Sequence, residues 1–230
     1  MCPAINPDLT SPKDLLLQAA LMHVPFDGWS RTTFDAAIDD SGVDRTVAQS
    51  VCPRGAVDLA LHYHARGDAQ MEEADLAAMK YSERVAAAVR FRLEAVEDKE
   101  LVRRGSTLFA LPMYAGDGAK AIWGTADAIW TALGDTSEDV NWYTKRATLS
   151  GVYSATVLYW LGDTSEDHAA TWAFLDRRIE DVMKIEKLKS QVRESPVLSK
   201  MMAGPNWLLS HIKAPQRMPQ AGLPGRWRRP

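Results

Sequence analysis

The sequence has little cysteine and no long apolar run. Cys2 and Cys52 are the only cysteines among 230 residues, and their separation fits neither a disulfide framework nor a metal-binding motif, which indicates a reducing compartment. No stretch approaches the ~18 consecutive apolar residues that a membrane-spanning helix requires. The N-terminal sequence MCPAINPDLTSPKD resembles neither a secretory signal nor an Arg-rich transit peptide. These absences predict a cytoplasmic protein.

Catalytic motifs are missing as well. The sequence contains no HExxH, ExxH, CxxC, GxSxG or GxxxxGK[ST] pattern. His62 and His64 are two positions apart and therefore point to different faces of a helix, which makes them poor joint ligands. The segment from Asp117 to Lys120 (DGAK) lacks the spacing of a phosphate-binding loop. We therefore predict that the protein is not an enzyme and has no cofactor and no metal site.

Helix start and stop signals are abundant, whereas strand signals are absent, so the sequence predicts an all-α fold. Ser11 and Pro12 open the first expected helix. A second runs from about Thr32 to Gly42, and Asp44 caps a third, RTVAQSV. A further helix follows from Ala56 and is expected to stop at Gly67. The longer helices after it are YSERVAAAVRFRLEAV, KELVRRGSTLFAL and KAIWGTADAIWTALG.

The heptapeptide LGDTSED occurs twice, at residues 133–139 and 161–167. We expect its glycine to end one helix and one of its polar residues, Asp135 or Thr136, to cap the next, in preference to binding Ca²⁺. The two copies then bracket a helix of about 22 residues that is apolar on most sides. The helix after the second copy has one apolar stripe, made of Trp172, Leu175, Ile179, Val182 and Met183.

The N-terminal part resembles the helix-turn-helix of TetR-type regulators, through AALMHVPFDGWSRTTFDAAIDDSGVDRTVAQSV with DSGVD at the turn. The resemblance implies a TetR-like fold, with a degenerate helix-turn-helix at 11–67 and a helical ligand-binding and dimerisation bundle at 68–190. Residues 1–75 carry five Lys and Arg against twelve Asp and Glu, a net charge of 5 − 12 = −7. Since DNA affinity depends on neutralising phosphates, we expect no DNA partner. A ligand-responsive transcription regulator remains the alternative function.

The segment GDTSEDVNWYTKRATLSGVYSATVLYWLGDTSEDHAATWAFLDRRIEDVM resembles the ubiquinone (coenzyme Q) biosynthesis accessory proteins, a lipid-binding and non-catalytic family. The resemblance implies a dimeric, bacterial relative of the mitochondrial proteins that presents a polyprenylated quinone intermediate to the demethoxyubiquinone hydroxylase. The partner-binding residues it implies are Asp139, Trp142, Tyr143, Lys145 and Arg146. Candidates for contact with an isoprenoid quinone or a phospholipid are Trp130, Leu149, Val152, Tyr153 and Thr156, although periodicity alone does not separate a cavity lining from packed core.

The C-terminal sequence changes character. Segment 196–213 places apolar residues on one side of two short helical stretches: Leu198, Met201, Met202, Trp207, Leu208 and Ile212. The acid-free tail 214–230 carries four arginines and is predicted to be disordered. An apolar face followed by cations suits an anionic membrane surface, so we expect peripheral association with the inner membrane. Packing of the same face on the folded domain is the alternative.

Overall fold

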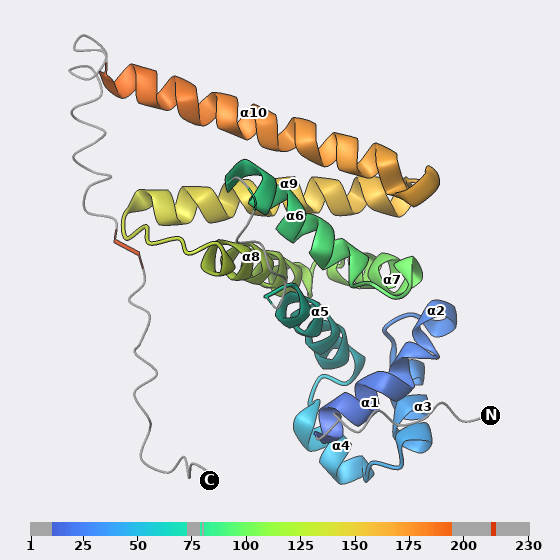
Figure 1. Ribbon diagram of the computed structural model, residues 1–230. Coiled ribbons are helices and arrows are strands. Elements are labelled where there is room, and N and C mark those ends of the chain that lie inside the picture. The colour runs from blue at the N-terminus through green and yellow to red at the C-terminus, as the bar shows by residue number, and fades with distance from the viewer. Residues whose placement is uncertain (1–10, 73–78, 80, 195–212, 215–230) are drawn as a thin grey trace, which may run out of the picture.

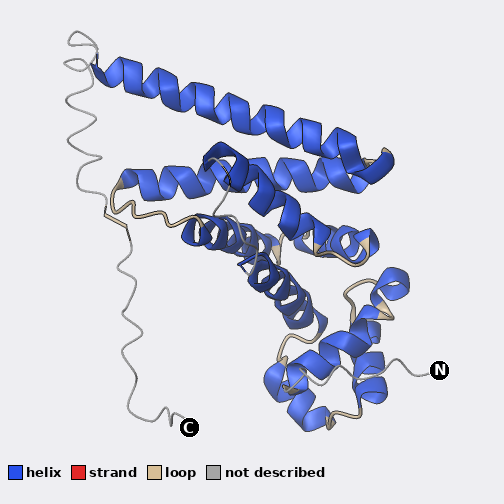
Figure 2. Ribbon diagram, in the orientation of Figure 1, coloured by secondary structure: helices blue, strands red, loops and turns tan. Residues whose placement is uncertain are grey.

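The computed structural model describes residues 11–72, 79, 81–194 and 213–214, and within these residues every regular element is helical (Figures 1 and 2). The all-α prediction is confirmed. The helices are α1 (Pro12–Leu21), α2 (Val24–Asp27), α3 (Arg31–Ser41), α4 (Arg45–Val51), α5 (Ala56–Glu72), α6 (Tyr81–Glu94), α7 (Lys99–Phe109), α8 (Ala115–Ala132), α9 (Val140–Gly162), the 3₁₀ turn η1 (Glu166–His168) and α10 (Ala169–Glu194).

Helices α1 to α4 form a small N-terminal unit (Figure 1), and its apolar core also includes residues of α5 and α7. Its boundaries follow the predicted caps. The Ser11 hydroxyl accepts a hydrogen bond from the Asp14 backbone N–H at 3.2 Å, Gly42 ends α3 with a φ of 67°, and the Asp44 carboxylate accepts from Thr46 and Val47. These caps satisfy backbone groups that the helices leave unpaired, and they depend on neighbouring residues only.

Helix α5 contradicts the expected stop at Gly67, because it continues to Glu72. Gly67 is buried inside the helix, and a Cβ atom there would lie only 2.4 Å from Nη1 of Arg92 on α6. The glycine is therefore required by the close approach of a buried side chain from another helix. A sequence reading cannot distinguish this use of glycine from a helix stop, since the neighbour lies 25 positions away.

The two LGDTSED copies have different structures. In the first, Gly134 ends the turn after α8 with a φ of 74°, as predicted, but Asp139 and not Asp135 or Thr136 caps α9. In the second copy the predicted glycine stop is wrong, because Gly162 is the last residue of α9 and has no positive φ. The Lys99 ammonium takes over the role of such a stop by donating to the Trp160 and Asp163 carbonyls at 2.8 and 3.0 Å.

Helix α9 is the centre of the larger unit. It contacts α8 on one side and α10 on the other, and α7 packs near its C-terminal half (Figure 1). Its buried residues Leu149, Val152, Tyr153 and Trp160 belong to one apolar core together with residues of α6, α8 and α10. The predicted helix between the heptapeptides is thus confirmed. In the predicted stripe of α10, Leu175 and Ile179 are buried against this core, Trp172 and Val182 are half-buried and Met183 is exposed.

Candidate partner and ligand sites on helix α9

The first turn of α9 presents an aromatic surface. Asp139 caps the helix by accepting from the Asn141 backbone N–H at 2.9 Å. The half-buried Trp142 packs between Trp123 of α8, at a ring-centroid distance of 5.9 Å, and Tyr143, at 4.8 Å with edge-on geometry. We call Asp139, Trp142, Tyr143 and Lys145 the α9 patch. These four residues share the helix end that the sequence predicted for partner binding.

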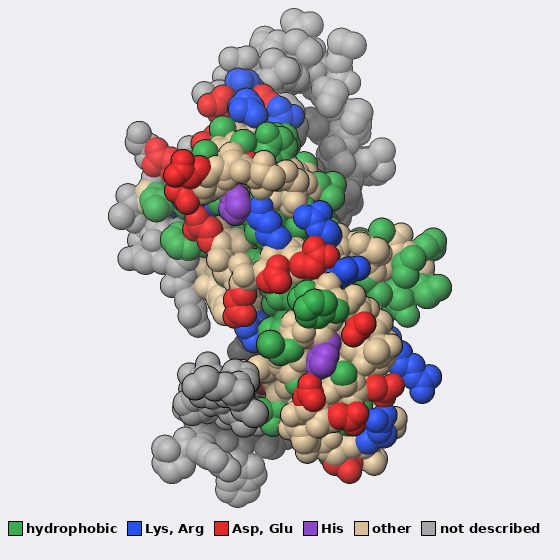
Figure 3. Space-filling view, turned by 90° about the vertical axis from the view of Figure 1, so that its right-hand side faces the viewer, with side chains coloured by type: hydrophobic (Ala, Val, Ile, Leu, Met, Phe, Trp, Pro, Cys, Tyr) green, Lys and Arg blue, Asp and Glu red, His purple; other side chains and the backbone are tan. Residues whose placement is uncertain are grey.

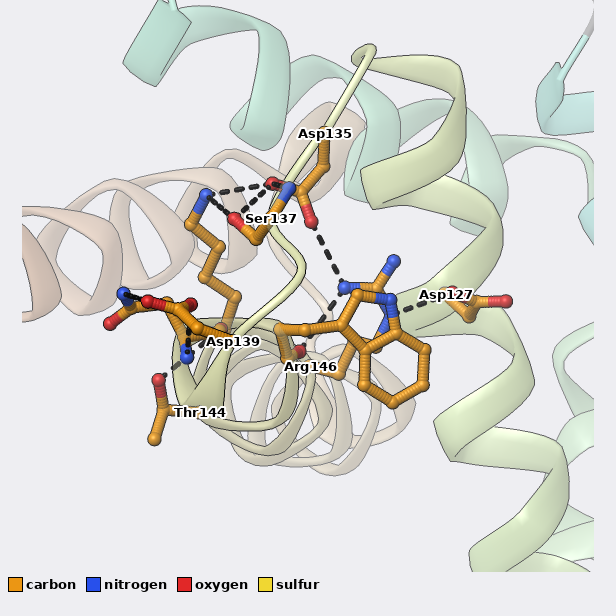
Figure 4. A network of polar contacts seen from close by, with 9 residues as sticks. Asp127, Asp135, Ser137, Asp139, Thr144 and Arg146 are labelled. Atoms are coloured by element: carbon orange, nitrogen blue, oxygen red, sulfur yellow. Dashed lines mark hydrogen bonds and ion pairs between the residues drawn. The ribbon is translucent and has the colours of Figure 1, made fainter. Parts of the chain in front are cut away.

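Arg146 lies beneath the α9 patch and has no exposed surface. Its Nε donates to Asp127 at 2.6 Å and its Nη1 donates to Asp135 at 3.0 Å, and the guanidinium lies 4.0 Å from the centre of the Trp142 ring (Figure 4). Arg146 was predicted to bind the partner, and the structure places its guanidinium inside the protein and not on the exposed surface. The guanidinium supports Trp142 from inside the protein, because two acids from the α8 region bind it there.

Asp135 of the first heptapeptide binds both cations, Lys145 and Arg146, of the segment WYTKR at residues 142–146. Its side chain is 2% exposed, and it accepts from Lys145 at 2.7 Å and from Ser137 at 2.8 Å as well as from Arg146. Burial alone would raise the pKa of Asp135, but these hydrogen bonds outweigh it and lower the pKa to about 2. The sequence reading missed this role, since the acid is 10 and 11 positions before its partners and looks like an ordinary cap.

The chain returns to the α9 patch near its C-terminal end. The Tyr143 hydroxyl donates to the Lys213 carbonyl at 3.3 Å, and the Ala214 N–H donates to the Glu138 carbonyl at 2.8 Å (Figure 1). A protein partner on the α9 patch would meet this segment. The predicted membrane residues Leu198, Met201, Met202, Trp207, Leu208 and Ile212 lie outside the described residues, as does most of the predicted basic tail.

A largely apolar cavity of about 340 Å³ lies between α9 and α10. Three of the five predicted lipid-contact residues line it: Trp130, Leu149 and Val152. Val85, Ile179, Val182 and Met183 complete its apolar lining, and Asn141, Thr144 and Lys145 connect it to the first turns of α9. We call it the α9/α10 cavity. It shares Lys145 with the α9 patch, so the two predicted sites adjoin.

A second cavity, of about 420 Å³, lies among α5 to α9, and we call it the α5/α7 cavity. Tyr153 lines it, whereas Leu149 and Val152 line the α9/α10 cavity. Thr156 lines neither of these cavities; it is fully buried and donates to the Val152 carbonyl at 2.8 Å. Tyr63, His64 and Arg92, which the sequence reading left out of the ligand site, also line the α5/α7 cavity.

The remaining polar clusters are structural. His62 contacts Asp14 at 2.6 Å and His64 contacts the Thr125 hydroxyl at 2.7 Å, so these histidines connect helices. Across residues 11–72, 79, 81–194 and 213–214, no group of three or more His, Cys, Asp or Glu side chains is arranged to hold a metal ion.

The N-terminal unit offers little charge for a nucleic acid. Arg45, at the start of the would-be recognition helix α4, donates to Asp35 of α3 at 2.7 Å, so that its charge is already paired. On the face seen in Figure 3, the described Lys and Arg side chains are interspersed with acids and form no continuous basic surface. The absence of a DNA partner stays a prediction. The pairing of Arg45 and the mixture of charges on this face give an electrostatic reason for it.

The architecture is that of an all-α protein with a TetR-like fold. The solved structure of a TetR transcriptional regulator from Nitrosomonas europaea matches it with a TM-score of 0.60, covering 73% of this chain and 95% of that chain at 17% sequence identity. At this identity the likeness shows the fold alone.

Sequence comparison identifies the family. Residues 115–186 match the model of the COQ9 family. The mitochondrial ubiquinone biosynthesis protein COQ9 of Drosophila melanogaster is 32% identical over 185 residues, covering 76% of this chain and 56% of the relative. That of Rattus norvegicus is 30% identical over 193 residues, covering 78% and 61%. The probable ubiquinone biosynthesis protein coq9 of Dictyostelium discoideum is 29% identical, covering 78% and 62%. This chain belongs to the COQ9 family.

The match is partial in length, because the chain spans about three fifths of these relatives. The COQ9 domain covers α8, α9 and the greater part of α10, and therefore includes the α9 patch and much of the lining of both cavities. The relatives are named as mitochondrial proteins. Among the described residues, no helix has the length and apolar character needed to cross a membrane.

Proposed function

We propose that this protein acts in ubiquinone biosynthesis as a lipid-binding accessory protein without catalytic activity of its own. In this proposal it shelters an isoprenoid quinone intermediate, or a phospholipid, between its helices. It then presents the quinone to the demethoxyubiquinone hydroxylase through the α9 patch, as a homodimer held at a membrane surface. The names of the COQ9 relatives support a role in ubiquinone biosynthesis. The resemblance of the WYTKR segment to the partner-binding motif of that family supports the hydroxylase as the partner.

The observation that carries this proposal is the position of helix α9, which borders both the predicted partner surface and the two cavities. Helix α9 begins at the α9 patch, and its side chains line a largely apolar cavity on each side. Volumes of about 340 and 420 Å³ lie within the range of roughly 300–1,000 Å³ typical of small-molecule sites. Burial of a hydrocarbon tail in such cavities contributes about 25 cal/mol per Å² of apolar surface, before the cost of ordering the ligand.

Lipid binding predicts that the purified protein carries an organic-extractable ligand. Extraction followed by mass spectrometry is expected to recover isoprenoid or phospholipid in amounts proportional to the protein. Leu149→Trp would fill part of the α9/α10 cavity and is expected to reduce recovery, whereas Met22→Trp, at an exposed position that lines neither cavity, is the control for it. Protein that is lipid-free in several preparations, and that takes up no added prenylated quinone, would contradict the proposal.

Partner binding predicts that Tyr143→Lys reduces capture of the hydroxylase at least about 10-fold, because aromatic residues at the centre of an interface contribute on the order of 2 kcal/mol or more. Tyr143 is preferable to Trp142 for this test, since a cation at position 142 would lie against the buried Arg146 and could unfold the helix start. Tyr159→Lys, at the far end of α9, is the matched control. Equal capture by both variants in a pull-down would remove the α9 patch as the partner surface.

A further inference from the structure

One peptide group near the end of the chain contacts the start of α9. The carbonyl of Lys213 accepts a hydrogen bond from the Tyr143 hydroxyl at 3.3 Å, and the N–H of Ala214 donates to the Glu138 carbonyl at 2.8 Å. Glu138 immediately precedes the cap residue Asp139, and Figure 1 shows the short stretch 213–214 beside the loop that leads into α9. Both polar groups of this peptide are therefore bonded to residues within or next to the α9 patch.

The local sequence suits a docked, extended backbone. Pro215 disfavours the helical conformation for the residue before it, so Ala214 is biased toward an extended one. Proline has no N–H group, which leaves the N–H of Ala214 as the one backbone donor of this residue pair. The side chain of Lys213 is exposed. The contact with α9 is therefore made by the backbone and leaves the lysine side chain in solvent.

The charges of the two parts are complementary. The segment 213–230 contains no Asp or Glu and five cations: Lys213, Arg217, Arg226, Arg228 and Arg229. At the docking site Glu138 and Asp139 are exposed acids, and Asp139 accepts hydrogen bonds there from the neutral amide groups of Asn141. A basic segment is attracted to such a site at moderate ionic strength. This attraction favours the docked position over the same chain extended into solvent.

The docked peptide and a protein partner would need the same place on the surface. The Tyr143 ring packs edge-on against Trp142 at a centroid distance of 4.8 Å, and its hydroxyl is the group that binds Lys213. The aromatic residues at the centre of an interface are covered by the partner, which excludes water and other chains from them. A partner that covers Tyr143 would therefore displace the Lys213 carbonyl.

We propose that the segment beginning at Lys213 is an intramolecular occupant of the α9 patch, and that the partner binds only to molecules in which this segment has left. The docking does not depend on the proposed function, whereas the exclusion of the hydroxylase rests on that function and adds a regulation to it. The apparent affinity for the hydroxylase is then the intrinsic affinity multiplied by the fraction of molecules in which the segment is undocked.

Limited trypsin digestion tests the docking without a partner, because the docked peptide bond between Lys213 and Ala214 is itself a trypsin site. Cleavage requires this peptide to leave α9, so its rate follows the undocked fraction. Tyr143→Phe removes one hydrogen bond and keeps the ring. It should raise the rate of cleavage after Lys213, relative to that after Arg217, by about 2- to 10-fold. Tyr159→Phe, near the other end of α9, is the matched control and should leave this ratio unchanged.

Capture of the demethoxyubiquinone hydroxylase by the full-length protein tests the exclusion. Ala214→Pro removes the N–H that donates to the Glu138 carbonyl, and it keeps every residue of the α9 patch and every charge. It should therefore increase capture by about 2- to 10-fold. Ala221→Pro, the same change at a position outside the docked peptide, is the matched control.

The outcomes separate the docking from the function. Equal cleavage ratios in the wild type and Tyr143→Phe would overturn the docking. Capture by Ala214→Pro that equals that of the wild type would overturn the exclusion, and so would reduced capture, which would show that the segment belongs to the partner surface. No capture by the wild type or by either proline variant would overturn the partner function and the exclusion together, while the trypsin result would still decide the docking.

Discussion

Replacing Asp135 by Asn is expected to lower the free energy of unfolding by about 3 kcal/mol, which corresponds to a fall in Tm of about 6–12 °C for a chain of this size. The variant removes the charge that Lys145 and the fully buried Arg146 share. Loss of one partner of a buried pair costs about 3–5 kcal/mol, and we take the lower value because Asp127 still binds Arg146. Thermal unfolding followed by circular dichroism measures the change.

The second heptapeptide supplies the matched control, Asp163→Asn. Asp163 occupies the same place in the motif, but its carboxylate accepts from neutral donors, the Ser165 N–H at 2.8 Å and the Thr171 N–H at 2.9 Å. Its replacement should therefore lower Tm by much less. Equal losses in the two variants would show that the buried network under the α9 patch contributes no more than a local cap.

The Asp135 network also predicts a dependence on pH. The carboxyl has a pKa of about 2 in the folded protein, against 3.8 for an unperturbed aspartate. Because the folded value is the lower one, its contribution to stability is fully present above about pH 4 and is lost as the pH falls toward 2. Asp135→Asn should lose this part of the acid-induced fall in stability. An unchanged difference in Tm between wild type and variant from pH 5 to pH 2.5 would contradict the assignment.

Gly67→Ala is expected to destabilise the protein by about 2 kcal/mol, although alanine favours a helix over glycine by about 1 kcal/mol. The new Cβ would lie 2.4 Å from Nη1 and 2.5 Å from Cζ of Arg92. Moving the Arg92 side chain away would cost free energy, because it is 4% exposed and hydrogen-bonded to Asp68 and the His64 carbonyl. Its displacement would break a buried ion pair, and that loss exceeds the gain in helix propensity.

Gly151→Ala is the control for this substitution. Gly151 is also inside a helix, but nothing lies within 4 Å of the Cβ it would acquire. The same chemical change should there raise the free energy of unfolding by up to about 1 kcal/mol. Urea unfolding of both variants should therefore give shifts of opposite sign. Stabilisation by both would show that the Arg92 side chain adapts freely.

The comparison of Gly67 with Gly151 shows which features of the fold can be predicted from the sequence and which cannot. The starts of α1 and α4 and the end of α3 could be predicted, because Ser11, Asp44 and Gly42 act on backbone groups within a few residues. The central helix between the heptapeptides was predicted as well, although Asp139 caps its start in place of Asp135 or Thr136. The resemblance of the segment around WYTKR likewise predicted the COQ9 family from contiguous residues.

Predictions from the sequence failed where the local structure depends on a side chain that is distant in the sequence. In the first LGDTSED copy Asp139 caps α9, while Asp135 is turned inward to Lys145 and Arg146. In the second copy Lys99, and not a glycine of positive φ, binds the carbonyl groups at the end of α9. Arg146 is buried because Asp127 and Asp135 meet it, and periodicity carries no information about such partners.

The sequence by itself therefore determined the all-α class, most helix starts, the family and the helix on which the proposed function rests. Only the tertiary structure decided that Trp130, Leu149 and Val152 line one cavity while Tyr153 lines another, and that Tyr63, His64 and Arg92 line the second cavity together with Tyr153. The physical reason is how far apart in the sequence the interacting residues are. Caps and helix periods are set by residues a few positions apart, whereas cavities and buried ion pairs form where helices distant in the sequence pack together.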